Sequence, residues 1–518
     1  MVSQLLKLLL VGLPAALAVS QTPDHVSVTY SASASSSEAH SESARVSFTT
    51  NVPINGTAIP DKSGGNNTHT NTTSPKKTGA RKVAGYYPVY HADGQSPSEL
   101  RYGQCSARIN IPNLYDEIIF FVAETNDNFT LSTRPLAQNE WDSLAFEFVQ
   151  GCKNRKIQFS SLSSRAIICR LSKIRYCAQQ HAIQINMKQI DSVIPTYCVG
   201  GWTGSRYFSE LTATAENRTA FADSTISFAK KYGFEGIDFD WECNQGIGCN
   251  TVSEQDWVNQ QLLFKEVKSK WPEGKISTAQ SIAGIRNGNY ERLPASDVAT
   301  MAEVVDEVRI MAYDGKLNPP IFVPVHGGFT KTTGPNAPIR GECADPDNQL
   351  SVESAIEVYL QQGFKPEQLS LGIPGSAKTW TLSKPELTPR IVGNYTSYYY
   401  QNFTGIPAGG EYDDRPGVDV CGQKTGNGGT WLVRELFENG FLSEDEKTGG
   451  KGFTRYYDEC SGEPFLASNT TLITYDDTES TVSKAEYAKY KDLGGIFFFD
   501  TMGPMDKTVK AARDALLN

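Results

Sequence analysis

Residues 234–242 read FEGIDFDWE, and this segment gives the clearest indication of the fold. Acidic side chains stand at every second position, at Asp238, Asp240 and Glu242, and large apolar residues fill the positions between them. Successive side chains of a β-strand point to opposite faces, so the three carboxyl groups project from one face. Neighbouring carboxylates out of water repel each other and lose solvation. We therefore expect at least one of them to have a raised pKa and to be neutral at pH 7, as a general acid must be.

Two other interpretations of this carboxyl row (Asp238, Asp240 and Glu242) stay open. The row could belong to a solvated edge strand, although the apolar residues within it and the helical pattern before it disfavour this. It could also hold a divalent metal ion, but no histidine lies nearby and the six histidines of the chain are scattered. The general-acid interpretation explains the residue types best.

Length and composition set the class of protein. The chain has 518 residues, of which 39% are hydrophobic and 10% aromatic, which is enough for a large core or for a domain with an insertion. A net charge of −10 disfavours nucleic acid or an anionic membrane surface as partner. A neutral polymer is compatible with this charge, but the charge does not select one.

The N-terminal region has the pattern of an exported protein. Residues 1–20 carry Lys7, an apolar run and the small-residue pattern Ala16-Leu17-Ala18, which is typical of a secretory signal peptide. Residues 21–80 are rich in Ser, Thr and Asn, and we interpret them as a disordered, glycosylated linker. No later run reaches the ~18 apolar residues of a membrane helix. We expect a secreted monomer, extracellular or in the cell wall, without a membrane span.

Sequons and cysteines agree with an oxidising compartment. The chain contains eight Asn-x-Ser/Thr sequons and ten cysteines. Cys243 with Cys249, and Cys421 with Cys460, are two possible disulfide pairs, while spacing alone leaves the other pairings open.

Strand-like and helical patterns alternate from about residue 81 to the C-terminus. The predicted strands are 83–87, 117–122, 196–199, 236–241, 275–279, 307–311, 369–372 and 495–499. Residues 219–232 have the apolar spacing of a helix, and Gly233 follows as a C-terminal stop. Eight strands separated by helices predict an α/β fold, a closed parallel (β/α)8 barrel. Active sites of such barrels lie at the C-terminal ends of the strands, where Asp240 and Glu242 fall.

Two gaps exceed a simple strand-to-helix crossover. About 120 residues separate the seventh and eighth strands, which predicts a small α+β insertion at about 380–480 between strand 7 and helix 7. Residues 157–195 precede the third strand and carry five basic residues against one acid in an otherwise acidic chain. We interpret 157–195 as an insertion, either genuine or an artefact of the gene model.

Several motifs resemble glycoside hydrolase family 18, the chitinases and their relatives. EGIDFDWE resembles the DxxDxDxE signature, with Glu235 at the position of its first aspartate. Residues 198–202, CVGGW, resemble the SxGG segment of strand 3, with Cys198 in place of serine. Residues 311–314, MAYD, resemble the MxYD of strand 6. Tyr86 stands at the position of the tyrosine in strand 1. Segments 246–250 and 334–338 resemble secreted fungal members, and the gap after strand 7 corresponds to the chitinase insertion domain.

The resemblance implies retaining hydrolysis of β-1,4-linked N-acetylglucosamine polymers by a substrate-assisted mechanism. It implies that Glu242 is the proton donor, that Asp240 orients the 2-acetamido group of the substrate and that Asp238 shares a proton with Asp240. Tyr313 would hold the acetamido carbonyl, so these four are the implied catalytic residues. The implied substrate-binding residues are Tyr86, Trp202, Met311, Asp314 and Phe499. The mechanism needs no metal and no cofactor.

Each single residue also has an ordinary structural interpretation. Tyr313, Tyr86 and Trp202 could be core aromatics, Asp314 could be a helix N-cap, and Asp238 could be a structural hydrogen-bond acceptor. The chain also departs from the family at Phe499, where tryptophan is usual, and at Ser376, where tyrosine is usual. Residues 315–320 lack an expected tryptophan, and about 316–326 could be a second insertion.

Three functions remain possible at this point. The first is a chitinase, most consistent with endo action. The second is a catalytically silent chitin-binding lectin on the same barrel. The third, an endo-β-N-acetylglucosaminidase acting on N-glycans, fits less well because the insertion domain indicates a groove for a linear polymer.

Overall fold

The computed structural model describes residues 15–22, 25–32, 81–89, 114–134, 136–154, 193–242, 250–314, 332–346, 349–419, 421–422 and 424–518. The chain divides into two compact units, Met1–Lys76 and Lys77–Asn518. In the first unit, β1 (Ala15–Thr22) and β2 (His25–Ala32) form an antiparallel pair. These strands occupy part of the expected signal peptide (1–20) and linker (21–80), both of which stay predictions.

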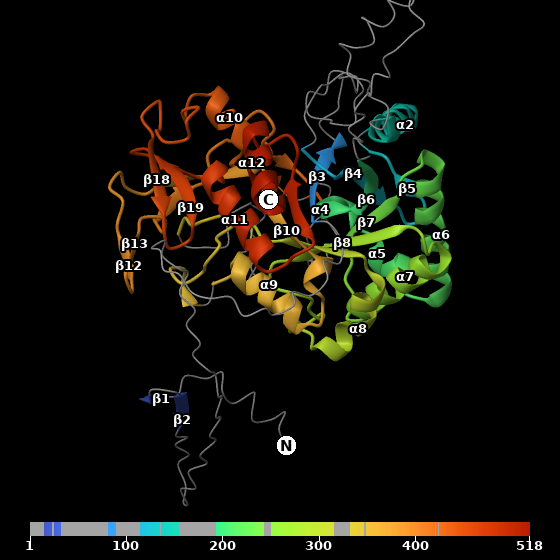
Figure 1. Ribbon diagram of the computed structural model, residues 1–518, viewed down its shortest axis with the longest axis horizontal. Helices are drawn as coiled ribbons and strands as arrows, with labels where there is room; N and C mark the ends of the chain where they lie inside the picture. The colour runs from blue at the N-terminus through green and yellow to red at the C-terminus, as the bar shows by residue number, and fades with distance from the viewer. Residues whose placement is uncertain are drawn as a thin grey trace, which may run out of the picture. The chain divides into compact units, whose positions relative to one another are not determined.

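Eight parallel strands of the second unit form a closed barrel (Figure 1). They are β3 (Lys82–Pro88), β4 (Glu117–Thr125), β6 (Ile194–Gly200), β7 (Gly236–Asp240), β8 (Lys275–Ser281), β9 (Glu307–Met311), β10 (Leu369–Pro374) and β21 (Gly495–Phe499). Each strand pairs with the next one along the chain, and β21 pairs with β3 to close the barrel. A short strand, β5 (Leu131–Ser132), pairs antiparallel with β4. The predicted (β/α)8 barrel is confirmed.

The alternation in β7 explains how the barrel places its acids. All five residues of β7 are buried. Phe239 packs against Phe264 of α7 (Asp256–Lys270), with ring centroids 5.0 Å apart, so the apolar side chains of the strand face the surrounding helices. The acidic side chains consequently point to the barrel interior, as a period of two requires.

Helices surround the barrel, and Figure 1 shows α6, α7 and α8 on its outside. The helices of the barrel unit are α2 (Gln138–Asn154), α4 (Gly201–Gly204), α5 (Phe208–Thr212), α6 (Ala215–Tyr232), α7 (Asp256–Lys270), α8 (Ala295–Val304), α9 (Val352–Gln361), the 3₁₀ turn η5 (Pro366–Gln368), α11 (Thr478–Tyr490) and α12 (Asp506–Leu517). Thr214 caps α6 by accepting a hydrogen bond from the Asn217 amide. The predicted stop, Gly233, ends α6 with φ 84°, a left-handed conformation that glycine adopts without strain.

A second sheet lies between β10 and α11, as the insertion predicted at about 380–480 requires. Its six antiparallel strands are β11 (Ser376–Leu382), β14 (Phe403–Gly405), β17 (Thr430–Leu432), β18 (Thr454–Asp458), β19 (Glu463–Ala467) and β20 (Thr471–Thr474). The subdomain also holds α10 (Val433–Glu438) and two hairpins, β12 (Arg390–Val392) with β13 (Tyr395–Ser397), and β15 (Gly417–Val418) with β16 (Lys424–Thr425). In Figure 1, β18 and β19 lie on the opposite side of the barrel from α6 and α7.

The disulfide arrangement corrects one prediction. Cys460 is bonded to Cys343, with Cα atoms 6.1 Å apart, and not to Cys421, which is in another disulfide. The bond joins the segment before α9 to the turn between β18 and β19. This proximity arises only in the folded barrel, so cysteine spacing could not reveal it. Cys243 and Cys249 lie outside the described residues.

The two suspected insertions fall mostly outside the described residues. Of the stretch 157–195, the structure describes only 193–195. Ile194 and Pro195 are the first residues of β6, so barrel strand 3 begins earlier than predicted and these residues are not inserted. The stretch at about 316–326 lies outside the described residues. Within the described part of the chain, none of the helices is both long enough and apolar enough to cross a membrane.

Candidate active site

The carboxyl row lies at the C-terminal end of β7. Asp238 is fully buried and Asp240 almost so, while Glu242, two residues beyond the strand, is partly exposed. The row therefore runs from the barrel interior to its rim. This is the end of a (β/α)8 barrel that carries active sites.

Asp238 is held by three groups from other strands. The Tyr86 hydroxyl donates to its Oδ2 at 2.7 Å, and the Ser277 hydroxyl donates to its Oδ1 at 2.6 Å. Nε of Arg309 lies 3.6 Å from the same Oδ1. Charge-assisted hydrogen bonds of this kind fix both the position and the rotamer of a carboxylate.

Asp240 has the opposite environment. Its Oδ1 is buried and has no hydrogen-bond partner among the described residues. Burial, followed by the neighbouring charges of Glu242 and Asp238, raises the pKa of Asp240 well above its usual range. An unpartnered buried oxygen of this kind is available to a ligand.

The backbone around the row is fixed by Ser205. Its hydroxyl donates to the Asp240 carbonyl at 3.0 Å and accepts from the Glu242 amide at 3.0 Å. Gly200, at the end of β6, has φ +119°, and a Cβ atom there would lie 2.1 Å from the Asp240 carbonyl oxygen. Only glycine fits this approach, which gives the SxGG-like segment a physical reason.

Glu242 has the properties of a general acid. Burial and then the charge of Asp314 raise its pKa to about 7. Nδ2 of Asn250 donates to the Glu242 carbonyl at 2.9 Å and fixes its backbone. A carboxyl group with this pKa holds its proton near neutral pH and can also release it, as Brønsted behaviour favours in acid–base catalysis.

Asp314 and Lys378 bring a barrel strand and the insertion subdomain together at the site. Asp314 follows β9 with φ 53°, and its amide donates to the Asn336 carbonyl at 3.2 Å. This conformation differs from the extended one of a helix N-cap, so that interpretation of Asp314 is not supported. Nζ of Lys378, on β11, lies 3.8 Å from Oδ1 of Asp314.

Aromatic residues line the barrel interior beside the row. The rings of Tyr86 and Phe499 have centroids 5.4 Å apart, and those of Tyr313 and Phe499 are stacked at 6.3 Å. Met311 packs against the same cluster. Burial, then the charges of Asp240 and Asp314, raises the pKa of the Tyr313 hydroxyl well above its usual range. The hydroxyl therefore remains a hydrogen-bond donor.

Trp202 is separate from this cluster. It lies on α4, is 42% exposed, and its carbonyl accepts a bond of 3.3 Å from Asn250. The core interpretation of Trp202 is therefore wrong, because a core aromatic would be buried. The structure thus brings eight of the nine predicted residues into the barrel interior or its rim near the row. It places Trp202 on the helix that follows β6, joined to Glu242 through the Asn250 amide, which donates to both carbonyls.

Sequence reasoning missed a group of buried and half-buried charges next to the row. Nη2 of Arg309 donates to Oε1 of Glu117 at 2.6 Å, and Nζ of Lys275 contacts Glu307 at 2.6 Å and also Glu117. A signal was present in β9, which reads EVRIM, because Glu307 and Arg309 alternate with apolar residues. In a barrel strand such alternation places charged side chains inside.

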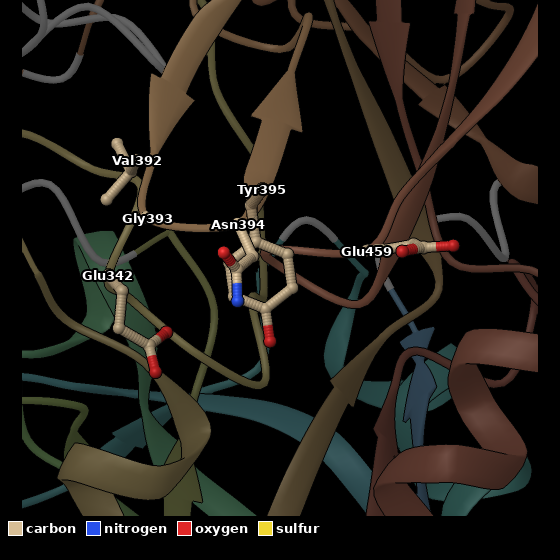
Figure 2. Close-up of a pocket in the computed structure, with 6 residues that line it drawn as sticks. All are labelled: Glu342, Val392, Gly393, Asn394, Tyr395 and Glu459. Atoms are coloured by element: carbon tan, nitrogen blue, oxygen red, sulfur yellow. The ribbon is translucent and has the colours of Figure 1, made fainter.

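A cavity of about 470 Å³ lies in a different place, at the insertion subdomain (Figure 2). Figure 2 shows Asn394 and Tyr395, at the turn of the β12–β13 hairpin, between Glu342 and Glu459. None of its lining residues belongs to the row. Within the described residues, no group of three or more His, Cys, Asp or Glu side chains is arranged to hold a metal ion.

Comparison with known families decides the identity of the barrel. The model of glycosyl hydrolases family 18 matches residues 82–503, which contain all eight barrel strands. The chain belongs to family 18. The match includes the carboxyl row, so the site lies in the part of the chain that defines the family.

Relatives within family 18 include differently named proteins. The chain is 34% identical over 318 residues to a chitinase-like effector of Moniliophthora roreri, covering 59% of this chain and 73% of the relative. It is 30% identical over 341 residues to Chitinase A1 of Niallia circulans, covering 63% of this chain and 43% of that protein. It is 29% identical over 318 residues to mouse Chitotriosidase-1, covering 57% and 55%.

Solved structures share the family 18 fold. The chitinase from Rhizomucor miehei has a TM-score of 0.61 at 23% identity, covering 84% of this chain and all of that chain. The Group IV chitinase of Ostrinia furnacalis, solved with allosamidin, has a TM-score of 0.59 at 18% identity, covering 84% and 98%. These likenesses establish the barrel architecture.

Proposed function

We propose that this family 18 glycoside hydrolase is a secreted chitinase that cleaves β-1,4-linked N-acetylglucosamine polymers with retention of anomeric configuration. One observation carries the proposal. Glu242, with a pKa of about 7, lies at the rim of the barrel in one row with Asp240, whose buried Oδ1 has no partner among the described residues. The relatives named Chitinase A1 and Chitotriosidase-1 support the choice of substrate.

In the first step Glu242 donates its proton to the glycosidic oxygen, and the bond between C1 and that oxygen breaks. The carbonyl oxygen of the substrate's 2-acetamido group bonds to C1 on the opposite face, which forms an oxazolinium ion. Asp240 accepts a hydrogen bond from the acetamido N–H through the Oδ1 that has no partner among the described residues. The partial negative charge of this oxygen stabilises the positive charge that develops on the ring.

Other residues hold the substrate in this arrangement. The Tyr313 hydroxyl donates to the acetamido carbonyl, and Asp314 binds a sugar hydroxyl. Trp202 and Phe499 stack on sugar rings, while Tyr86 and Met311 complete the wall of the site.

In the second step a water molecule attacks C1, which reopens the oxazolinium ring. Glu242 now accepts the proton of that water and returns to its starting state. Two displacements at C1 give overall retention. Neither step requires a metal or a cofactor. We propose that the protein is a monomer and that it cleaves internal bonds of the polysaccharide.

A chitin-binding lectin is the second candidate, and two observations favour it. Phe499 stands where family members commonly have tryptophan, so the stacking area at the cleaved sugar is smaller. Two relatives, from Moniliophthora roreri and Moniliophthora perniciosa, are named chitinase-like effectors. The lectin would use the same row to bind the acetamido group without cleavage.

The anomeric form of the first product tests the proposed reaction. Purified protein is mixed with chitotetraose, and ¹H NMR follows the anomeric protons before mutarotation, with Glu242→Gln as control. We expect the β-anomer to appear first with the unchanged protein only. An α-anomer as first product would contradict the substrate-assisted mechanism, and binding of chitotetraose without any product would identify the lectin.

A further inference from the structure

Arg309 is a fully buried cation at the inner end of the carboxyl row. Its Nη2 donates to Oε1 of Glu117 at 2.6 Å, and its Nε lies 3.3 Å from Oε1 of Glu307 and 3.6 Å from Oδ1 of Asp238. The guanidinium carbon is 5.7 Å from the ring centroid of Tyr86, whose hydroxyl bonds the same Asp238. The proposed mechanism gives this cation no role.

Asp238 is enclosed by side chains from five strands. The groups that face it are Tyr86 of β3, Cys198 of β6, Asp240 of its own strand β7, Ser277 of β8 and Arg309 of β9. Burial raises the pKa of the Cys198 thiol, so this group stays uncharged. Within the described residues Arg309 is therefore the one cation in contact with Asp238.

Hydrogen bonding distinguishes Asp238 from the next carboxyl of the row. Both carboxylate oxygens of Asp238 accept a hydroxyl hydrogen bond, one from Tyr86 and one from Ser277. Hydrogen bonds to both oxygens and a nearby guanidinium favour the charged form of a carboxyl group over its neutral form. Oδ1 of Asp240, by contrast, has neither a donor nor a cation next to it among the described residues.

We propose that Arg309 is a positioning residue that compensates the charge of Asp238 and so keeps the proton of the row on its outer members, Asp240 and Glu242. The inference rests on the proposed function of the row. Arg309 is not one of the three acids, but as a cation on β9 it stabilises the negative charge on Asp238 at the inner end of the row. The proton is then available at the end where the glycosidic oxygen binds.

Removal of Arg309 has a defined electrostatic consequence. Without the cation, negative charge at the inner end is less favourable, and Asp238 competes with Asp240 for the proton. Negative charge then moves toward Glu242, and every carboxyl in the row holds its proton more tightly. An opposite charge within about 4–6 Å moves carboxyl titrations by about 1–3 pH units, so both limbs of the pH profile should move upward.

The chain contains a matched control for this experiment. Lys275 is a second, half-buried cation of the same group and contacts the same two acids, Glu117 and Glu307, but no contact joins it to the row in the described structure. Arg309→Met and Lys275→Met therefore both remove one positive charge from the group. Only the first removes it from Asp238.

The experiment measures kcat/KM for chitotetraose from pH 3 to pH 9 for the unchanged protein, Arg309→Met, Arg309→Lys and Lys275→Met. We expect the acidic limb to move up by about one pH unit in Arg309→Met, with a loss mainly in kcat. Arg309→Lys should recover most of the unchanged profile, and Lys275→Met should keep its shape. A superimposable profile for Arg309→Met, or an equal shift in Lys275→Met, would overturn the proposal.

A double variant and a binding measurement cover two further outcomes. If Arg309→Met does not fold, the double variant Arg309→Met with Glu117→Gln removes the cation together with its strongest partner, and it should show the same upward shift. An unshifted profile in the folded double variant would also overturn the proposal. If the unchanged protein binds chitotetraose without cleaving it, the proposed function fails separately. The pH dependence of binding then tests Arg309 with the same variants and the same expected direction.

Discussion

The Tyr86 hydroxyl donates a 2.7 Å hydrogen bond to Oδ2 of Asp238 and thereby joins the first and fourth barrel strands. These strands are not neighbours in the sheet, since β3 pairs with β4 and β21. The bond therefore crosses the barrel interior. It makes the position of the inner carboxyl depend on the closure of the whole barrel and not on β7 alone.

Tyr86→Phe should impair catalysis without disturbing the fold. The substitution removes one hydroxyl, and a hydrogen bond to a charged group contributes about 1.5–3 kcal/mol, so kcat/KM should fall about 10- to 100-fold. Tyr87→Phe is the control, because Tyr87 is the next residue of the strand and packs against Phe120 on the other face. Unchanged kinetics in Tyr86→Phe would show that the bond has no part in the reaction.

The raised pKa of Glu242 predicts how activity depends on pH. The group must be protonated to act as the acid, so kcat/KM should decline as the pH rises through about 7. The measurement is a rate profile with chitotetraose between pH 4 and pH 9. A profile that stays flat to pH 9 would assign proton donation to another group.

The same pKa predicts that Glu242 lowers the free energy of unfolding at alkaline pH. From about 4.5, its ordinary value, to about 7, the folded state binds a proton that the unfolded state has released, so stability decreases as the pH rises through this window. Glu242→Gln lacks this dependence. The variant should match the unchanged protein in Tm at pH 4 and exceed it at pH 8, where the difference in the free energy of unfolding is on the order of 3 kcal/mol. A lower Tm for the variant at pH 8 would contradict this sign.

A buried ion group holds the insertion subdomain to the barrel helices. Lys484 of α11 is fully buried and donates to Oε1 of Glu463 at 2.9 Å and to Asp476. Burial and then the charge of Asp476 contribute to raising the pKa of Glu463 to about 8, against the lowering effect of Lys484. Glu463 also accepts the Ala337 amide at 2.9 Å, so the group is tied to the segment beside the active site.

Lys484→Met should therefore destabilise the protein by about 3–5 kcal/mol, because it leaves buried carboxyl groups without a cation. The loss should be larger at pH 9 than at pH 7, because Glu463, with a pKa of about 8, is charged at the higher pH. Lys447→Met is the control: its ion pair with Glu479 is exposed and should contribute no more than about 1 kcal/mol. Chemical denaturation of the three proteins at two pH values measures both effects, and equal losses in the two variants would refute the role of burial.

The sequence predicts the barrel and the row for the same physical reason. Period two in residues 236–241, together with helical spacing before it, specifies a buried strand whose acids face inward. Gly233 marks the end of α6 because few other residues adopt its φ without strain. These patterns depend only on residues close together in the sequence, and the structure has the strand and the helix end that they predict.

Long-range features could not be read in the same way. Arg309 and Glu117 are 192 positions apart, and only barrel closure brings them together. Folding of the insertion subdomain brings Cys460 next to Cys343, so the predicted disulfide between Cys460 and Cys421 was wrong. The exposure of Trp202 depends on the short helix α4 after β6, which has only four residues and therefore shows no helical spacing of apolar residues in the sequence. Tertiary geometry decides each of these cases.

The most direct test of the proposed function is hydrolysis of chitotetraose by the unchanged protein and by Glu242→Gln, with binding recorded for both by calorimetry. We expect cleavage by the unchanged protein alone and binding by both proteins, because the Glu242→Gln substitution keeps the shape of the site and removes only the proton. Cleavage by the variant at a comparable rate would contradict the assignment of Glu242. Binding without cleavage by either protein would contradict the chitinase and identify a lectin on the same barrel.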